Sequence, residues 1–158
     1  MKQTIIKALL CVVVLLCSLN ASAQIKALEK YADMKNVTYV FISKYMLGMA
    51  EKNAAFSVPG VNLKVLTDKL SGIQIIASEN RSVRTRLRND VKAFLTKDKY
   101  ELMMQMNEDD DKVNIYHHIG KQQSAVIMIS DNDDEFVIMA FSGKFTMEDV
   151  MKMTLDLH

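Results

Sequence analysis

The chain has 158 residues, with 20 Lys and Arg against 19 Asp and Glu, so its formal net charge is only +1. Nucleic-acid-binding domains usually carry a clear basic excess, and this balance argues against that class. Both cysteines, Cys11 and Cys17, lie near the N-terminus. The rest of the chain therefore has no thiol for a disulfide, a thiolate metal site or a cysteine nucleophile.

Residues 1–23 have the composition of a secretory signal peptide. The start is basic, an apolar run covers 8–16, and Ala21-Ser22-Ala23 matches a small-residue cleavage site. The apolar run is shorter than the roughly 20 residues that span a bilayer. We therefore expect a periplasmic or secreted protein, cleaved near Ala23 and not integral to the membrane.

A lipid anchor at Cys17 is the alternative to simple cleavage. Lipidation of a bacterial leader requires a small residue before the cysteine, and Leu16 is bulky. The anchor is therefore less favoured than cleavage near Ala23. With the leader removed, residues 24–158 are expected to form a single domain, which is the usual length for one hydrophobic core.

The first half of this domain predicts short helices alternating with two strands. Apolar residues at helical spacing favour helices over 24–35, 44–52 and 63–70. Runs rich in β-branched residues favour strands over 37–42 and 73–78.

A longer helix is predicted over 82–96, because apolar residues recur there every three or four positions. This stripe consists of Val83, Leu87, Val91, Phe94 and Leu95.

Four strands are predicted next, at 100–106, 113–119, 125–129 and 136–141. The turns between them are short and polar, which favours an antiparallel meander. A closing helix follows, with Thr146 in position to cap its first turn.

This order of elements predicts an α+β fold with a largely antiparallel sheet, a C-terminal four-strand meander and covering helices. The strands at 125–129 and 136–141 are apolar on both faces, whereas a strand with one wet face should alternate. Two interpretations stay open at this point. Either helices cover both faces of these strands, or one face is buried against another protein.

Metal binding has little support in the sequence. His117 and His118 are adjacent, and neighbours on a strand point to opposite faces, so they cannot hold one ion together. The acidic turns at 108–111 and 131–135 offer oxygen ligands but lack the spacing of an EF-hand. Asp and Asn are also ordinary turn residues. We therefore predict no metal and no cofactor.

The best candidate binding residues are Arg81, Arg84 and Arg88, at and near the start of the 82–96 helix. Arg84 and Arg88 are four residues apart and share a helix face. Together they could bind a phosphate, a carboxylate or an acidic partner. The alternative is an ordinary solvated face whose charge is offset by nearby acids.

Catalytic motifs are missing from the sequence. It contains no Gly-x-Ser-x-Gly, His-Glu-x-x-His, phosphate-loop or dinucleotide pattern. We therefore expect no enzyme. The alternative is an envelope hydrolase whose site is assembled only in space, with Glu79, Glu101 and His118 as the first residues to consider.

Several segments resemble a known family. They are Val37–Leu47, Gly72–Asn80, Tyr100–Met103, Asp111–Tyr116, Phe136–Ile138 and Ser142–Phe145. Together they are similar to the domain of unknown function 4252 family, small envelope proteins of Gram-negative bacteria. The resemblance implies export and a link to envelope signalling, because the family's genes often lie near those of extracytoplasmic sigma factors. It implies no catalytic residues. Many members look lipid-anchored, and this chain departs from them at Leu16.

The sequence thus favours a non-catalytic periplasmic or secreted binding module of the cell envelope. An envelope protein or an anionic envelope component is the expected partner. Besides the hydrolase, the other alternative is a structural protein that assembles through its last strands, for instance as a homodimer.

Overall fold

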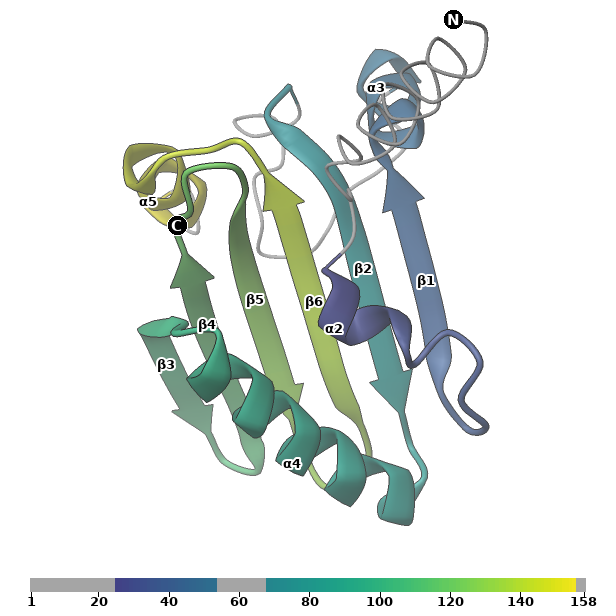
Figure 1. Ribbon diagram of the computed structural model, residues 1–158. Helices are drawn as coiled ribbons and strands as arrows, with labels where there is room; N and C mark the ends of the chain where they lie inside the picture. Colours follow the sequence, from purple (N-terminus) through teal and green to yellow (C-terminus); the bar gives the residue numbers. More distant parts are fainter. Residues whose placement is uncertain (1–24, 54–67, 156–158) are drawn as a thin grey trace, which may run out of the picture.

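The computed structural model describes residues 25–53 and 68–155 (Figure 1). The predicted signal peptide lies outside these residues, and so does most of the helix predicted over 63–70. The last residue of that prediction, Leu70, begins a strand instead.

The described helices follow the sequence predictions in order, with changed boundaries. They are α2 (Lys26–Glu29), α3 (Lys44–Asn53), α4 (Arg81–Lys97) and α5 (Met147–Leu155). The strands are β1 (Thr38–Ser43), β2 (Leu70–Ser78), β3 (Glu101–Glu108), β4 (Asp111–His118), β5 (Ser124–Asp131) and β6 (Phe136–Gly143). The α+β prediction is therefore confirmed.

All six strands form one antiparallel sheet in the order β1-β2-β6-β5-β4-β3. The four C-terminal strands are consecutive neighbours, so the predicted meander is confirmed. β2 then pairs with β6, which places β5 and β6 at the centre of the sheet. These last two strands have no free edge, and a partner could reach them only through a face of the sheet.

One face of the sheet, here called the helix face, is covered by α4 and α2 (Figure 1). Asn80 caps α4, because its side-chain oxygen accepts hydrogen bonds from the backbone N–H groups of Ser82 and Val83 at 3.2 Å. The predicted stripe of α4 then packs on the central strands. Its fully buried Leu87 lies in one cluster with Ile127 and Ile138.

The helix predicted over 24–35 is much shorter than expected. After α2, the N–H groups of Tyr31, Ala32 and Met34 each donate to the carbonyl three residues earlier, as in tight turns. Asn36 then adopts a left-handed conformation with φ of 60° and leads the chain into β1.

The segment is anchored to the sheet by Gln74, a buried polar side chain of β2. Its Oε1 accepts from the N–H of Ile25 at 2.6 Å, and its Nε2 donates to the carbonyl of the same residue at 3.3 Å. Nε2 also contacts the hydroxyl of Tyr39 at 3.1 Å. Gln74 therefore satisfies the backbone at the point where α2 begins.

The opposite face of the sheet is covered at one end by α3 and α5. Leu47 of α3 and Val150 of α5 belong to a second cluster with Phe141, Val126 and Ile73. Helix α5 begins with a reciprocal cap: Thr146 N–H donates to Asp149 Oδ2 at 2.8 Å, and Asp149 N–H donates to Thr146 Oγ1 at 3.4 Å. The predicted capping role of Thr146 is confirmed.

Strand β3 departs from the simple alternation of its sequence. Leu102 pairs with Tyr116, but the next partner, Ile115, lies opposite Met104, so Met103 is the extra residue of a β-bulge. The bulge turns Met104 and Met106 to the face opposite the one that Leu102 occupies. A regular strand would place Leu102, Met104 and Met106 on one face, and the bulge separates Leu102 from the other two.

Candidate binding face of the sheet

A continuous apolar row crosses the face of the sheet opposite the helix face. Directly opposed residues of antiparallel strands point to the same side. Val40 lies opposite Ile75, Ile75 opposite Met139, Met139 opposite Met128, Met128 opposite Ile115, and Ile115 opposite Met104. We call this side the methionine face.

Burial along the central strands separates the two faces. In β6, Phe136, Ile138 and Ala140 are buried on the helix face, whereas the intervening Val137 and Met139 are only partly buried. At the margins of the methionine face, Val40 is 40% exposed and Met106 is 52% exposed. Among the described helices, α3 and α5 cover only the far end of this face. Its other half is apolar and partly exposed.

Acidic groups border this half. Beyond the Val40 row, a second row joins Thr38, Ala77 and Val137 across three strands. Thr38 and Ala77 also line a cavity of about 550 Å³, whose lining includes the carboxylates of Glu79 and Glu135. The apolar methionine face therefore borders an acidic cavity at this end of the sheet.

The predicted binding arginines occupy different environments. Arg88 forms a bidentate pair with Asp131, with Nε–Oδ2 at 2.7 Å and Nη2–Oδ1 at 2.6 Å, and this carboxylate raises the pKa of Arg88. Arg84 donates to the backbone carbonyl of Asn132 at 3.1 Å and to that of Asp133. Both arginines therefore brace the β5–β6 turn against α4.

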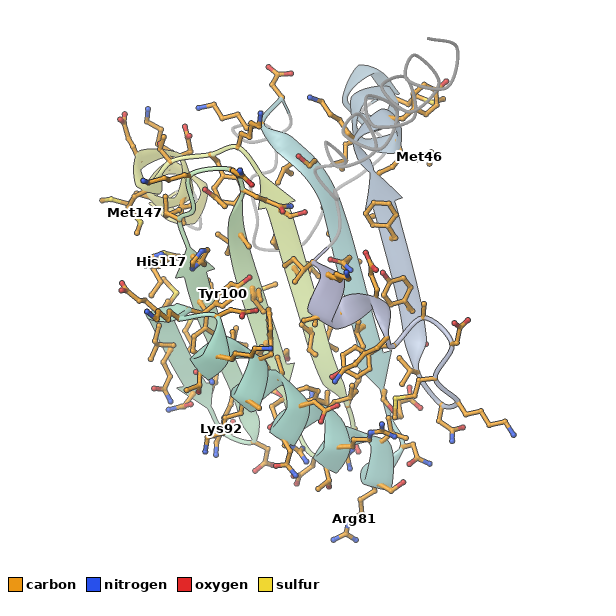
Figure 2. The ribbon with its side chains drawn as sticks, in the orientation of Figure 1. Met46, Arg81, Lys92, Tyr100, His117 and Met147 are labelled. Atoms are coloured by element: carbon orange, nitrogen blue, oxygen red, sulfur yellow. The ribbon has the colours of Figure 1, made fainter. Side chains whose placement is uncertain are left out.

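Arg81 is exposed at the start of α4 and points away from the sheet (Figure 2). The three arginines do not converge on a common ligand position. A binding role for them stays a prediction, and a ligand at Arg84 or Arg88 would compete with the contacts to the turn.

The residues considered for a hydrolase are not brought together. Glu101 lies opposite His117 on the methionine face, with a distance of 3.9 Å between Oε2 and Nε2. His118 points to the helix face, where its ring lies 5.4 Å from that of Tyr100. Glu79 lies at the other end of the sheet, in the acidic cavity. This arrangement offers no shared acid–base pair.

His118 and Tyr100 do line a second cavity, of about 430 Å³, beside the beginning of α2. Lys26 and Asp98 contribute opposite charges to its lining. Burial raises the pKa of Tyr100 well above its ordinary value, so the phenol stays protonated. The group is neutral at physiological pH and is not activated as a base.

The acidic β5–β6 turn has the side-chain hydrogen bonds of an ordinary turn. Asn132 Oδ1 accepts from the N–H groups of Asp134 at 3.0 Å and Glu135 at 2.6 Å, which closes the β5–β6 connection. Within residues 25–53 and 68–155, no three His, Asp or Glu side chains gather as metal ligands would.

In the same part of the chain, no helix has both the length and the apolar content to cross a bilayer.

Comparison with known proteins places the chain in a family. The model of a domain of unknown function, DUF4252, matches residues 31–153. The chain belongs to this family. The match includes every described strand and all of the segments that carried the resemblance. No curated protein and no solved structure matches the chain, so the DUF4252 assignment defines the family without naming an activity.

The sequence showed that the last two strands are apolar on both faces. It did not predict that apolar residues of all six strands form one continuous row, which is the methionine face. The missing information was the pairing of β2 with β6 and the bulge at Met103, which align residues from six strands. One available signal was the methionine content of the meander, at Met104, Met106, Met128 and Met139. Methionine is common at adaptable binding surfaces as well as in cores.

Proposed function

We propose that this chain is a non-catalytic binding module of the bacterial cell envelope, and that its methionine face takes an amphipathic helix of a partner protein. The observation that carries the proposal is the half-covered apolar row from Val40 to Met104. Contiguous apolar surface of this kind marks interaction sites in soluble proteins. Burying it gains roughly 25 cal/mol per Å² of apolar area removed from water.

A helix is the occupant that suits this surface. On the helix face, α4 already lies across the same central strands and fills the space with a stripe of apolar side chains. A partner helix on the methionine face would complete a third layer in the same manner. The unbranched methionine side chains can adjust to such a helix more readily than β-branched residues can.

Charge narrows the choice of partner. The carboxylates of Glu79 and Glu135 line the hollow at the open end of the face. Glu108 and Asp111 lie opposite each other two pairs beyond Met106, and both are exposed. A helix with Lys or Arg at one end of its apolar stripe would place those cations here. A second copy of this chain would instead bring acids against acids.

The envelope context comes from the sequence. The N-terminal leader pattern predicts export, and the family resemblance implies an exported protein. A role beside envelope signalling fits a protein that binds without catalysing a reaction, and it is part of the proposal.

The test is site-specific photo-crosslinking in living cells. A photoreactive residue at Met106 or Val40 reports on the methionine face, and one at Lys92, exposed on α4, is the matched control for the helix face (Figure 2). We expect one discrete protein adduct from Met106 and Val40 and none from Lys92. Equal adducts from both faces, no adduct, or an adduct of twice the chain's mass would contradict the proposal.

Two further variants test the charge requirement. Combined Glu79→Gln and Glu135→Gln substitutions should reduce the adduct yield, because they neutralise the acidic hollow. The control is Asp110→Asn, which removes one charge from the exposed tip of the β3–β4 turn. An equal reduction by both would show a general effect of net charge and not a local contact.

A further inference from the structure

The end of the molecule that carries α3 and α5 differs from the rest of the surface in its exposed apolar side chains. Tyr45 and Met46 of α3 are 77% and 56% exposed, and Met151 of α5 is 53% exposed. Ile119, just after β4, is 42% exposed. With Met49 and Met147, this end holds six of the nine large apolar side chains classed as exposed in the described part of the chain.

These side chains are spread across the width of the sheet. Figure 2 shows Met46 near one upper corner of the molecule and Met147 near the other. Six strands at about 4.8 Å spacing separate the two corners by roughly 24 Å. An extended flat surface would meet both corners at once.

The charge at this end is slightly basic. Lys69 pairs with Asp149 at 2.5 Å and Lys152 with Glu148 at 2.8 Å, so these four groups neutralise one another. Lys44, Lys121 and Lys144 are also exposed here. Within the described residues these three lysines form no ion pair. The other charged residues that the described elements place at this end are Lys52 and Glu51 of α3, Asp68 before β2 and Glu101 at the start of β3, so the end carries a small basic excess.

The opposite end is acidic. All four residues from Glu108 to Asp111 carry carboxylates, and the β5–β6 turn adds Asp133, Asp134 and Glu135. The molecule therefore has an apolar end with a small basic excess and an acidic end, along the direction of its strands. In the field of an anionic surface, this asymmetry selects one orientation.

We propose that the α3–α5 end docks on the surface of an anionic phospholipid bilayer. Tyr45, Met46, Ile119 and Met147 would enter the interfacial layer, and Lys44, Lys121 and Lys144 would meet the headgroup phosphates. The sheet would then contact the membrane with this end, and its methionine face would remain accessible to a partner. The proposal is independent of the partner helix and goes beyond it.

Vesicle flotation tests this docking. The chain exported by its own leader is purified from cells, its N-terminus is identified by mass spectrometry, and it is mixed with vesicles of phosphatidylethanolamine and phosphatidylglycerol or of phosphatidylcholine alone. We expect binding to the anionic vesicles only, weakening as salt is raised because headgroup attraction is screened. Equal binding to both vesicle types, or none to the anionic ones, would overturn the proposal.

Matched variants locate the contact. Lys121→Glu with Lys144→Glu should lower the partition coefficient at least roughly tenfold, since each lysine near an anionic surface contributes about fivefold. Lys112→Glu, at the acidic end, is the charge control. Tyr45→Ser with Met46→Ser should also weaken binding, whereas Leu102→Ser, 52% exposed on β3, should not.

All four variants change exposed side chains and keep the same N-terminus, so any contribution of the N-terminal segment is common to them. Circular dichroism confirms folding of each. If the control variants weaken binding as much as the α3–α5 variants do, the docking surface lies elsewhere and the proposal is wrong. Crosslinking at Met106 is read separately, so failure of docking and failure of the partner proposal remain distinguishable.

Discussion

The two faces of the sheet use the same strands in different ways. On the helix face, α4 covers the apolar residues, and two polar side chains there have defined partners: Gln74 binds the backbone at Ile25 and Arg88 binds Asp131. On the methionine face, α3 and α5 cover one end and leave an apolar row partly exposed. The difference suggests that the first face supplies stability and the second supplies a binding surface.

The largest expected effect lies on the helix face. Leu87 is fully buried in the stripe of α4, so Leu87→Ala should cost about 2–5 kcal/mol of unfolding free energy through lost burial and a cavity. Met139→Ala on the methionine face should cost clearly less, because Met139 is only partly buried. Urea unfolding measures both values. Equal costs would remove the distinction between the faces.

The next effect concerns the anchor of α2. Gln74→Leu keeps the side-chain volume but leaves the N–H and carbonyl of Ile25 without their partner. The expected cost is about 1–3 kcal/mol, measured by urea unfolding. The control is Gln105→Leu on exposed β3, which should change stability by less than about 0.5 kcal/mol. A neutral Gln74→Leu would show that α2 is held by apolar packing alone.

Strand β3 and the arginines show how far the sequence could be interpreted. Periodicity predicted α4 and the meander, because both depend on local spacing. It could not predict the bulge at Met103 or the pairing of β2 with β6, which join residues far apart in the chain. For the same reason, Arg84 and Arg88 gave no sign that the β5–β6 turn is their partner.

A smaller effect depends on pH and on the cap of α5. The hydrogen bond from Lys69, together with that from Thr146, lowers the pKa of Asp149 to about 2 from an ordinary value of 3.8. A carboxylate with a lowered folded-state pKa stabilises the protein above its unfolded pKa, and this stabilisation is lost as pH falls toward the folded value.

Asp149→Asn should therefore reduce stability at pH 7 and lose its difference from wild type between about pH 4 and pH 2. Urea midpoints measured across this range check the prediction. Glu148→Gln, next in the chain and exposed, is the control, and its difference from wild type should be smaller at pH 7. A constant difference between Asp149→Asn and wild type would exclude an ionised cap.

The smallest expected change in stability is at Arg88. Its pair with Asp131 is bidentate, but both side chains are partly exposed, at 39% and 27%. Arg88→Ala should therefore cost about 1 kcal/mol or less. It should also leave crosslinking from Met106 unchanged, since Arg88 contacts the turn from the helix face. Loss of the adduct in this variant would instead favour the arginines as the binding surface.

The most direct test of the account compares photo-crosslinking at Met106 with that at Lys92 in the same cells. We predict a discrete protein adduct from Met106 that falls when Glu79 and Glu135 are neutralised, and no adduct from Lys92. An adduct from Lys92 alone would contradict the assignment of binding to the methionine face.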